Sequence, residues 1–203
     1  MSVNLQAKEK HNFDMVSGTQ EIFRLLLDAL ANPGRAVDIS TQACKFAANG
    51  KWLATALTLL DNECGFYWDG PADLGEEIQF LSGSTQLPFE NADFVFLSKV
   101  GTNSGPMAAD ILSRAKRGTH LDPHDSAMIV VAAGGKVECP LLLNGPGIPP
   151  DGRTVLLSVS EAVWIKERDA QNFEYPCGVE IVFMREDNSL LAITRKAAVT
   201  WPM

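Results

Sequence analysis

The sequence predicts an α/β fold, a layered α/β/α sandwich with a mixed sheet. Segments with apolar residues at helical spacing alternate along the chain with short apolar runs of strand length. The runs 127–132 and 137–143 lack polar alternation, which is typical of strands that are covered on both faces. Two further runs flank the polar residues 186–189, which predicts an antiparallel hairpin near the end of the chain.

The first predicted helix begins near Ser17 and ends before Pro33. Residues 17–20 have the capping-box pattern, in which the Ser17 hydroxyl and the Gln20 side chain bind exposed backbone N–H groups. Apolar residues then recur at helical spacing. Pro33 cannot continue a helix, and Gly34 permits a sharp turn after it.

The other elements follow from the same two patterns. Pro106 suits the first position of a helix, and Ser160 can cap another. The predicted helices are 51–60, 76–81, 107–117 and 161–170, and the predicted strands are 65–68, 94–97, 127–132, 137–143, 154–159, 179–184 and 190–194.

Size and composition predict a single domain over 1–203, with a flexible polar segment at 1–12. The net charge of −8 disfavours a nucleic-acid partner, because an acidic surface repels phosphate backbones. No apolar run is long enough for a membrane span, and no signal peptide is evident, so we expect a cytoplasmic protein. The four cysteines form no C-x-x-C pair, and we interpret them as small buried side chains in a reducing compartment.

The most distinctive local string is Asn144-Gly145-Pro146-Gly147-Ile148, which follows an apolar strand. Its backbone N–H groups could hold a phosphate or phosphonate oxygen, or the string could be a structural turn. Arg35, Arg195 and Lys196 are further candidate anion contacts by charge, with an exposed face as the alternative, and the first two enter the predicted set. The predicted anion-binding set is therefore Arg35, Asn144, Gly145, Gly147 and Arg195.

Two other groups are candidates for a reactive site. His120 and His124 stand near two aspartates, but Pro123 prevents a regular helix through the pair, so no metal site is predicted. Lys99 follows a predicted strand, where a lysine could form a Schiff base or be solvated. Nucleophile elbows, dinucleotide fingerprints and phosphate-binding P-loops are absent from the sequence. The residues alone thus indicate an α/β domain without a self-contained active site, and the catalytic residues stay unknown.

Three stretches together resemble the H-subunit family of the carbon–phosphorus lyase core complex, a family of phosphonate metabolism proteins. The first is 23–34, the apolar helix that ends in Asn-Pro-Gly, and the second is the Gly-Pro-Gly-Ile loop within 141–148. The third, 175–195, enters through Tyr-Pro-Cys-Gly-Val-Glu and ends on Thr-Arg. His120 and His124 have no counterpart in the family pattern, and alanines follow Arg195 and Lys196 where the family is more basic.

The resemblance implies a fold similar to that of pyridoxal-phosphate-dependent transferases, with the cofactor site lost and no cofactor bound by this chain. It implies the G, I and J core subunits as partners, and a homodimer when the chain is isolated. It also implies an accessory role in organophosphonate breakdown, in which ATP and an alkylphosphonate form ribose 1-alkylphosphonate 5-triphosphate before the C–P bond is cleaved. An autonomous transferase of related fold and a phosphonate- or nucleotide-binding module remain alternatives.

Overall fold

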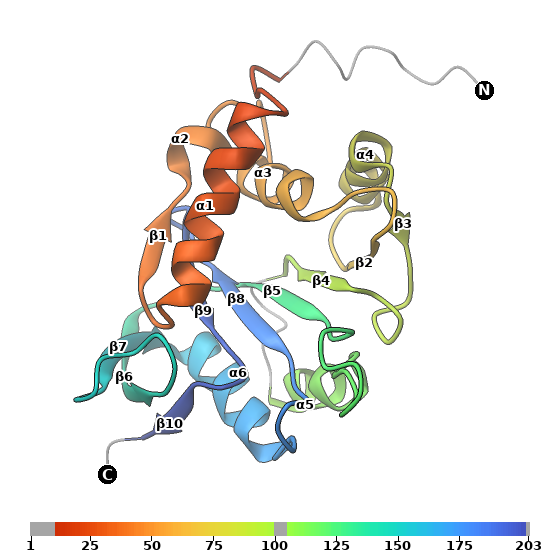
Figure 1. Cartoon of the computed structure of the whole chain (residues 1–203). Coiled ribbons are helices and arrows are strands. Elements are labelled where there is room, and N and C mark those ends of the chain that lie inside the picture. Colours follow the sequence, from red (N-terminus) through yellow and green to blue (C-terminus); the bar gives the residue numbers. More distant parts are fainter. Residues whose placement is uncertain (1–10, 100–104, 202–203) are drawn as a thin grey trace.

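A computed structural model describes residues 11–99 and 105–201, and its centre is a seven-stranded mixed sheet (Figure 1). The strand order is β1-β9-β8-β5-β4-β2-β3. The five strands β8, β5, β4, β2 and β3 run parallel to one another, whereas β9 is antiparallel to both β8 and β1. The predicted mixed sheet and terminal hairpin are therefore confirmed. The strands are β1 (Ala36–Asp38), β2 (Gly65–Trp68), β3 (Thr85–Gln86), β4 (Phe94–Leu97), β5 (Met128–Ala132), β8 (Glu180–Met184) and β9 (Ser189–Ile193).

Helices cover both faces of this sheet, as Figure 1 shows. The alternation of side chains along β5 places Val130 in one hydrophobic cluster and Ile129 and Val131 in the other. The cluster around Val130 includes residues of the first, third and fourth helices, and the other includes residues of the last two. The helices are α1 (Ser17–Ala31), α2 (Ser40–Ala43), α3 (Gly50–Leu59), α4 (Ala72–Ser82), α5 (Gly105–Arg114) and α6 (Val159–Ala170).

A second sheet of three antiparallel strands has the order β10-β6-β7. It consists of β6 (Val137–Asn144), β7 (Arg153–Ser158) and β10 (Ala198–Thr200). Leu141 and Leu143 of β6 join the cluster that contains α5 and α6, but Pro140 is exposed. The expectation that this strand is covered on both faces is wrong, because it lies outside the main sheet and one of its faces meets solvent.

The two predicted helix caps are wrong in detail. At α1 the side chain of Asp14, not Ser17, accepts hydrogen bonds from the N–H groups of residues 16 and 17. At α6 the cap is Ser158, whose hydroxyl accepts from the N–H of Glu161 while the Glu161 carboxylate accepts from the N–H of Ser158. This reciprocal pair is a complete capping box, so the cap lies two residues before Ser160 and the helix begins at Val159.

Helix ends also differ from the prediction. α5 ends at Arg114 rather than at 117, and α4 is longer than the predicted 76–81. The short elements β1, α2, β3 and β10 were not predicted, because so few residues carry no clear period. The flexible segment expected at 1–12 falls mostly on 1–10, outside the described residues. None of the helices in 11–99 and 105–201 has the length and apolar character that a membrane crossing requires.

Candidate functional site

A pocket of about 500 Å³ lies where the C-terminal end of α1 meets the loop after β6. Leu30 and Ala31 form one wall, and Pro146 and Gly147 form the next. The remaining walls come from segments 123–124, 175–176 and 194–196, with Glu180. The pocket therefore brings the loop singled out in the sequence together with the predicted anion contact in the closing hairpin. We call it the helix-end pocket.

The two glycines of the loop allow backbone to approach backbone. Gly147 has φ +76°, and a Cβ there would lie 2.0 Å from the carbonyl oxygen of Ala31. Gly145 has φ +132°, and its Cβ would lie 2.8 Å from the carbonyl oxygen of Lys196. Only glycine tolerates both the positive φ and these distances. The loop is thus wedged between the end of α1 and the turn after β9.

Arg195 lines the pocket, but its guanidinium donates to acceptors within the protein. Nε donates to Glu180 Oε1 at 2.6 Å. Nη1 donates to the carbonyl oxygen of Pro123 at 2.8 Å, and Nη2 donates to Ser126 Oγ at 2.5 Å. The backbone N–H of Arg195 also donates to Glu180 Oε2 at 2.8 Å. The residue therefore ties the closing hairpin to segment 123–126, and its charge is balanced by Glu180.

A second arginine, which is buried on α6, stabilises the same turn. Arg168 donates to the carbonyl oxygens of Thr194 and Ala197, both at 3.0 Å, and pairs with Asp169 at 2.8 Å. Sequence reasoning missed it, although it stands three residues after Ile165 on the buried face of the helix. The signal that could have found it is a cation at helical spacing from the apolar residues Trp164 and Ile165.

The wall at 123–126 is held from the other side by Lys116. Its ammonium binds Asp93 Oδ1 at 2.7 Å and also contacts Asp125. Burial by itself lowers the pKa of Lys116, but the hydrogen bonds to Asp125 and Asp93 outweigh it and hold this pKa above its usual value. The lysine therefore stays charged and keeps the segment next to the sheet.

The other predicted anion-binding residues lie outside the helix-end pocket. Arg35 is exposed and faces Asp28 at 3.4 Å. Asn144 pairs with Ala198 in the small sheet. Of the predicted set, Gly147 and Arg195 line the pocket and Gly145 belongs to its loop, while the chain does not bring Arg35 or Asn144 to it.

The two candidate groups for a reactive site are also separated. His124 lines the helix-end pocket, whereas His120 faces Glu174 at 3.6 Å in a different pocket. Within the part of the chain that the structure describes, no three His, Cys, Asp or Glu side chains are placed to hold a metal ion. Lys99 is exposed after the end of β4.

Tyr175 and Lys196 form the outer rim of the pocket. The Lys196 ammonium lies 4.7 Å from the centre of the Tyr175 ring, a cation–π contact. Both residues also line a second hollow of about 620 Å³, so the two concave regions share this rim. From the sequence, Lys196 was a candidate anion contact by its charge, and Tyr175 opens the third family-like stretch, but no local pattern predicted that these two side chains meet.

A family described as bacterial phosphonate metabolism protein (PhnH) matches residues 11–200. The chain belongs to the PhnH family. The resemblance drawn from three sequence stretches is confirmed, since the match spans nearly the whole chain. No curated protein matches the chain. PhnH proteins act in phosphonate metabolism and belong to the C–P lyase complex, so this chain has a role in that metabolism and partners in that complex.

Proposed function

We propose that this PhnH-family chain is a non-catalytic subunit of the C–P lyase core complex, where it supports the conversion of alkylphosphonates with ATP. Its proposed partners are the G, I and J subunits. The reactive steps take place on those partners, and this chain contributes shape and contact surface, with no cofactor of its own. A C–P bond offers no leaving group to simple acid–base chemistry, so a cofactor on another subunit must carry the cleavage.

One observation carries the proposal: the strongest cations at the candidate site are engaged within the protein. Arg195 and Arg168 together donate to two carboxylates, one hydroxyl and four carbonyl oxygens of this chain. A substrate phosphonate would have to displace these acceptors, most of them partly buried, and the free energy lost with those hydrogen bonds would offset the new contact. Arg195 lines the helix-end pocket and Arg168 holds the turn that follows it, so both arginines act by shaping the surface of this chain.

The test is growth of a strain that lacks this gene on methylphosphonate as sole phosphorus source. We expect no growth, rescue by the wild-type chain, and co-purification of the tagged chain with the G, I and J subunits. A double variant, His124→Ala with Tyr175→Phe, removes two groups of the pocket that could transfer protons. We expect it to rescue growth as well as the wild type does.

Two results would contradict the proposal. Normal growth of the deletion strain would show that the chain is dispensable for phosphonate use. Failure of the double variant to rescue, with an intact complex, would show that His124 or Tyr175 takes part in the chemistry.

A second candidate function is a ligand-binding module, and the size of the helix-end pocket favours it. A volume of about 500 Å³ lies in the range of small-molecule sites, and Lys196 supplies a cation beside the Tyr175 ring. Calorimetric titration of the purified chain with ATP and with methylphosphonate tests this function. Binding that Lys196→Ala weakens would support it, and the absence of heat with both ligands would exclude it.

A further inference from the structure

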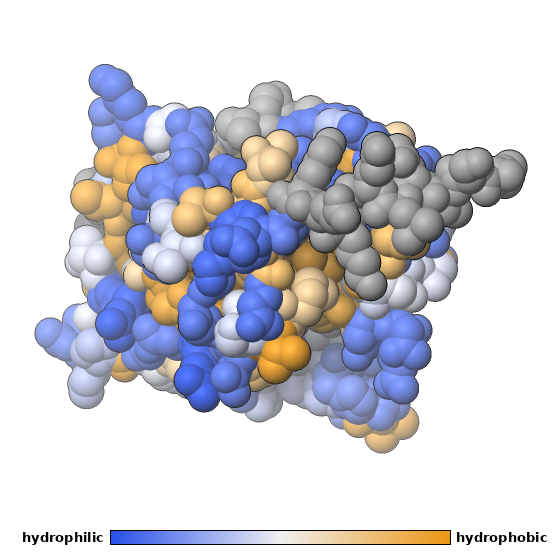
Figure 2. Space-filling model, turned by 90° about the horizontal axis from the view of Figure 1, so that it is seen from above, coloured by the Kyte–Doolittle hydropathy of each residue, from blue (hydrophilic) through white to orange (hydrophobic). Residues whose placement is uncertain are grey.

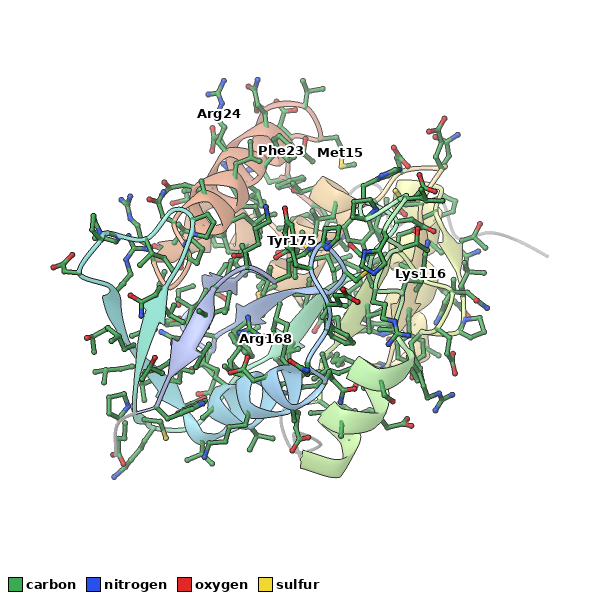
Figure 3. The ribbon with its side chains drawn as sticks, turned by 60° about the horizontal axis from the view of Figure 1, so that its bottom comes forward. Met15, Phe23, Arg24, Lys116, Arg168 and Tyr175 are labelled. Carbon is green, nitrogen blue, oxygen red and sulfur yellow. The ribbon has the colours of Figure 1, made fainter. Side chains whose placement is uncertain are left out.

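We infer that β7 is a docking edge, beside which an extended segment of a partner subunit adds a fourth strand to the small sheet. The inference rests on the proposed function and adds to it the place of one contact and the backbone conformation of the partner. β7 is the last strand in the order β10-β6-β7, so one of its sides has no neighbouring strand. Figure 1 and Figure 3 both show β6 and β7 at the margin of the ribbon.

The first observation is the direction of the backbone groups of β7. Pro140 of β6 is opposite Leu156 and has no N–H, so this pair cannot exchange the two N–H···O bonds of a hydrogen-bonded pair. The hydrogen-bonded pair beside it is therefore Leu141 with Val155. Because bonded and non-bonded pairs alternate, the N–H and C=O groups of Thr154 and Leu156 point away from β6.

Two hydrogen bonds support this direction. The carbonyl oxygen of Leu156 accepts from Arg185 Nη2 at 3.1 Å, a group outside the small sheet. The N–H of Ser158, two residues later, donates to Glu161 Oε2 in the cap of α6. Within the part of the chain that the structure describes, no group outside the small sheet binds the N–H or C=O of Thr154 or the N–H of Leu156. These three backbone groups can therefore pair with a segment of another chain.

The second observation is that β7 lacks the features that protect natural sheet edges. Such edges are short or bulged, or they carry proline or charged residues, lysine above all. The other edge strands, β1, β3 and β10, have three, two and three residues, whereas β7 has six. β7 has no proline or lysine, and its one charged side chain, Arg153, binds the carbonyl oxygens of Asn32 and Pro33. An edge of this length without protection is a template for a further strand.

The third observation is an uncharged outer face beside this edge. Leu156 is 51% exposed, and Thr154 and Pro140 are exposed on the same face. Pro140 is opposite Leu156, and the half-buried Leu142 is opposite Thr154. None of these four side chains carries a charge. A side chain next to Leu156 on a fourth strand would cover its exposed surface, so the partner segment carries an apolar residue at that position.

Exposed apolar side chains on the helices do not specify a partner in this way. Figure 2 shows the side on which α1–α4 lie, where apolar residues are exposed among polar ones. The backbone of a helix is hydrogen-bonded within itself, so its surface can fit many partner shapes. A strand edge instead selects an extended segment, because that conformation presents N–H and C=O groups at the matching spacing.

A second copy of the chain is the less favourable occupant, because two-fold pairing of β7 with itself uses backbone groups that are already bound. Registers centred on residues 154–156 use the Leu156 carbonyl oxygen, which accepts from Arg185. A register centred on residue 153 uses the Gly152 N–H, which donates to the carbonyl oxygen of Pro149 at 2.9 Å. A segment of another subunit is not subject to this symmetry and can place a residue without a free N–H opposite Leu156.

The experiment uses the full-length tagged chain co-expressed with the proposed G, I and J subunits. Thr154→Pro removes an outward N–H and places a ring at the edge, and we expect it to reduce the co-purified partners by at least about tenfold. The matched control is Thr154→Val, which keeps the N–H and suits a strand, and it should retain the wild-type yield. Both variants should melt within about 4 °C of the wild type, because the N–H that proline removes has no partner within the chain.

A second variant provides the test if Thr154→Pro does not fold. Leu156→Lys leaves the backbone unchanged and puts a charge on the outer face, and we expect it to reduce the captured partners by at least about fivefold. Its control is Phe80→Lys on α4, a helix that packs on the main sheet and on which the native phenylalanine is 59% exposed. The control should retain the wild-type yield.

Hydrogen exchange measures the strand pairing directly. The amides of Thr154 and Leu156, resolved by overlapping peptides, should exchange at least about tenfold more slowly in the complex than in the isolated chain. The amide of Val155 is the internal reference, because β6 protects it in both states. Unchanged exchange at residues 154 and 156 in an intact complex would overturn the inference.

The outcomes separate the inference from the function on which it rests. If the wild-type chain captures none of the three subunits, the proposed function fails and the docking edge fails with it. If folded Thr154→Pro captures them as well as Thr154→Val does, the function stands and the contact lies elsewhere. If light scattering shows a wild-type dimer that Thr154→Pro converts to a monomer while partner capture persists, a second copy pairs with β7 and the inference is wrong.

Discussion

Replacing Gly147 by alanine tests whether the loop after β6 packs against the end of α1 as the structure shows. Gly147 has φ +76°, and its missing Cβ would lie 2.0 Å from the carbonyl oxygen of Ala31 and 3.0 Å from the carbonyl carbon. The clashing atoms belong to the backbone of a helix end, so rotation of a side chain cannot relieve the overlap. The loop must move away from α1 by about 1.5 Å, which brings the Cβ to an ordinary contact distance of about 3.5 Å.

The expected loss of stability has two parts. A non-glycine residue in the left-handed region costs about 1–2 kcal/mol. Forcing extra volume between packed backbone segments costs about 1–3 kcal/mol more. Gly147→Ala should therefore lower the free energy of unfolding by about 2–5 kcal/mol. The control is Gly83→Ala, because Gly83 has nearly the same φ, +75°, and the atom closest to its added Cβ would be a side-chain carbon at 3.6 Å. Gly83→Ala should therefore show only the cost of the left-handed backbone, about 1–2 kcal/mol.

Urea denaturation of the purified chain measures both variants against the wild type. We expect unchanged m-values, and a free energy of unfolding about 1–3 kcal/mol lower for Gly147→Ala than for Gly83→Ala. For a chain of this size that difference corresponds to about 2–12 °C in Tm, taking about 2–4 °C per kcal/mol. Equal losses in the two variants would refute the reasoning, since they would show that no backbone clash exists at 147 and that the pocket wall is placed differently.

Three further predictions concern the core and the surface. Glu161→Ala should cost about 3 kcal/mol in urea denaturation, because it strands the Arg185 guanidinium that binds the fully buried carboxylate at 2.6 Å; a loss below about 1 kcal/mol would contradict a buried pair. Burial raises the pKa of Asp93, but hydrogen bonds from Lys116 and a backbone N–H hold it below its usual value. The stability that this carboxylate contributes is therefore present above about pH 4 and lost as the pH falls further, so Asp93→Asn should flatten the acid limb of the stability curve, and an unchanged limb would argue against the contact. Leu26→Ala should cost about 3 kcal/mol, whereas the exposed Leu27→Ala should cost less than about 1 kcal/mol; similar losses would mean that α1 is rotated about its axis.

The elements with long or uninterrupted apolar patterns were predictable from the sequence. Strands 65–68 and 94–97 have the predicted bounds, because their apolar runs end at turn residues. The cap of α6 could also have been predicted, because Ser158 and Glu161 have capping-box spacing. Ser160 is a residue of the same capping type two positions later, and it was chosen instead. β3 could not be predicted, because a two-residue strand exists only through its pairing with β2.

The candidate site was predictable in part for a similar reason. A glycine-rich loop and a cationic residue at the end of a hairpin can be recognised from local sequence, and both line the helix-end pocket. Arg35 was predicted on charge alone, and charge does not indicate whether a side chain lies near the other residues of a site. The exposure of Phe23 and Leu27 on α1 could not be predicted, because apolar residues at these two positions also fit a helix with a wider buried face.

The sequence by itself determined the family, through the order of its motifs, and the succession of helices and strands, through their periods. Only the tertiary structure decided which charges are available to a partner. Arg195 meets its acceptors 72 and 69 residues away along the chain, and Arg168 meets one 29 residues away. Hydrogen bonding depends on distances of about 3 Å in space, and local sequence carries no record of contacts formed between segments so far apart.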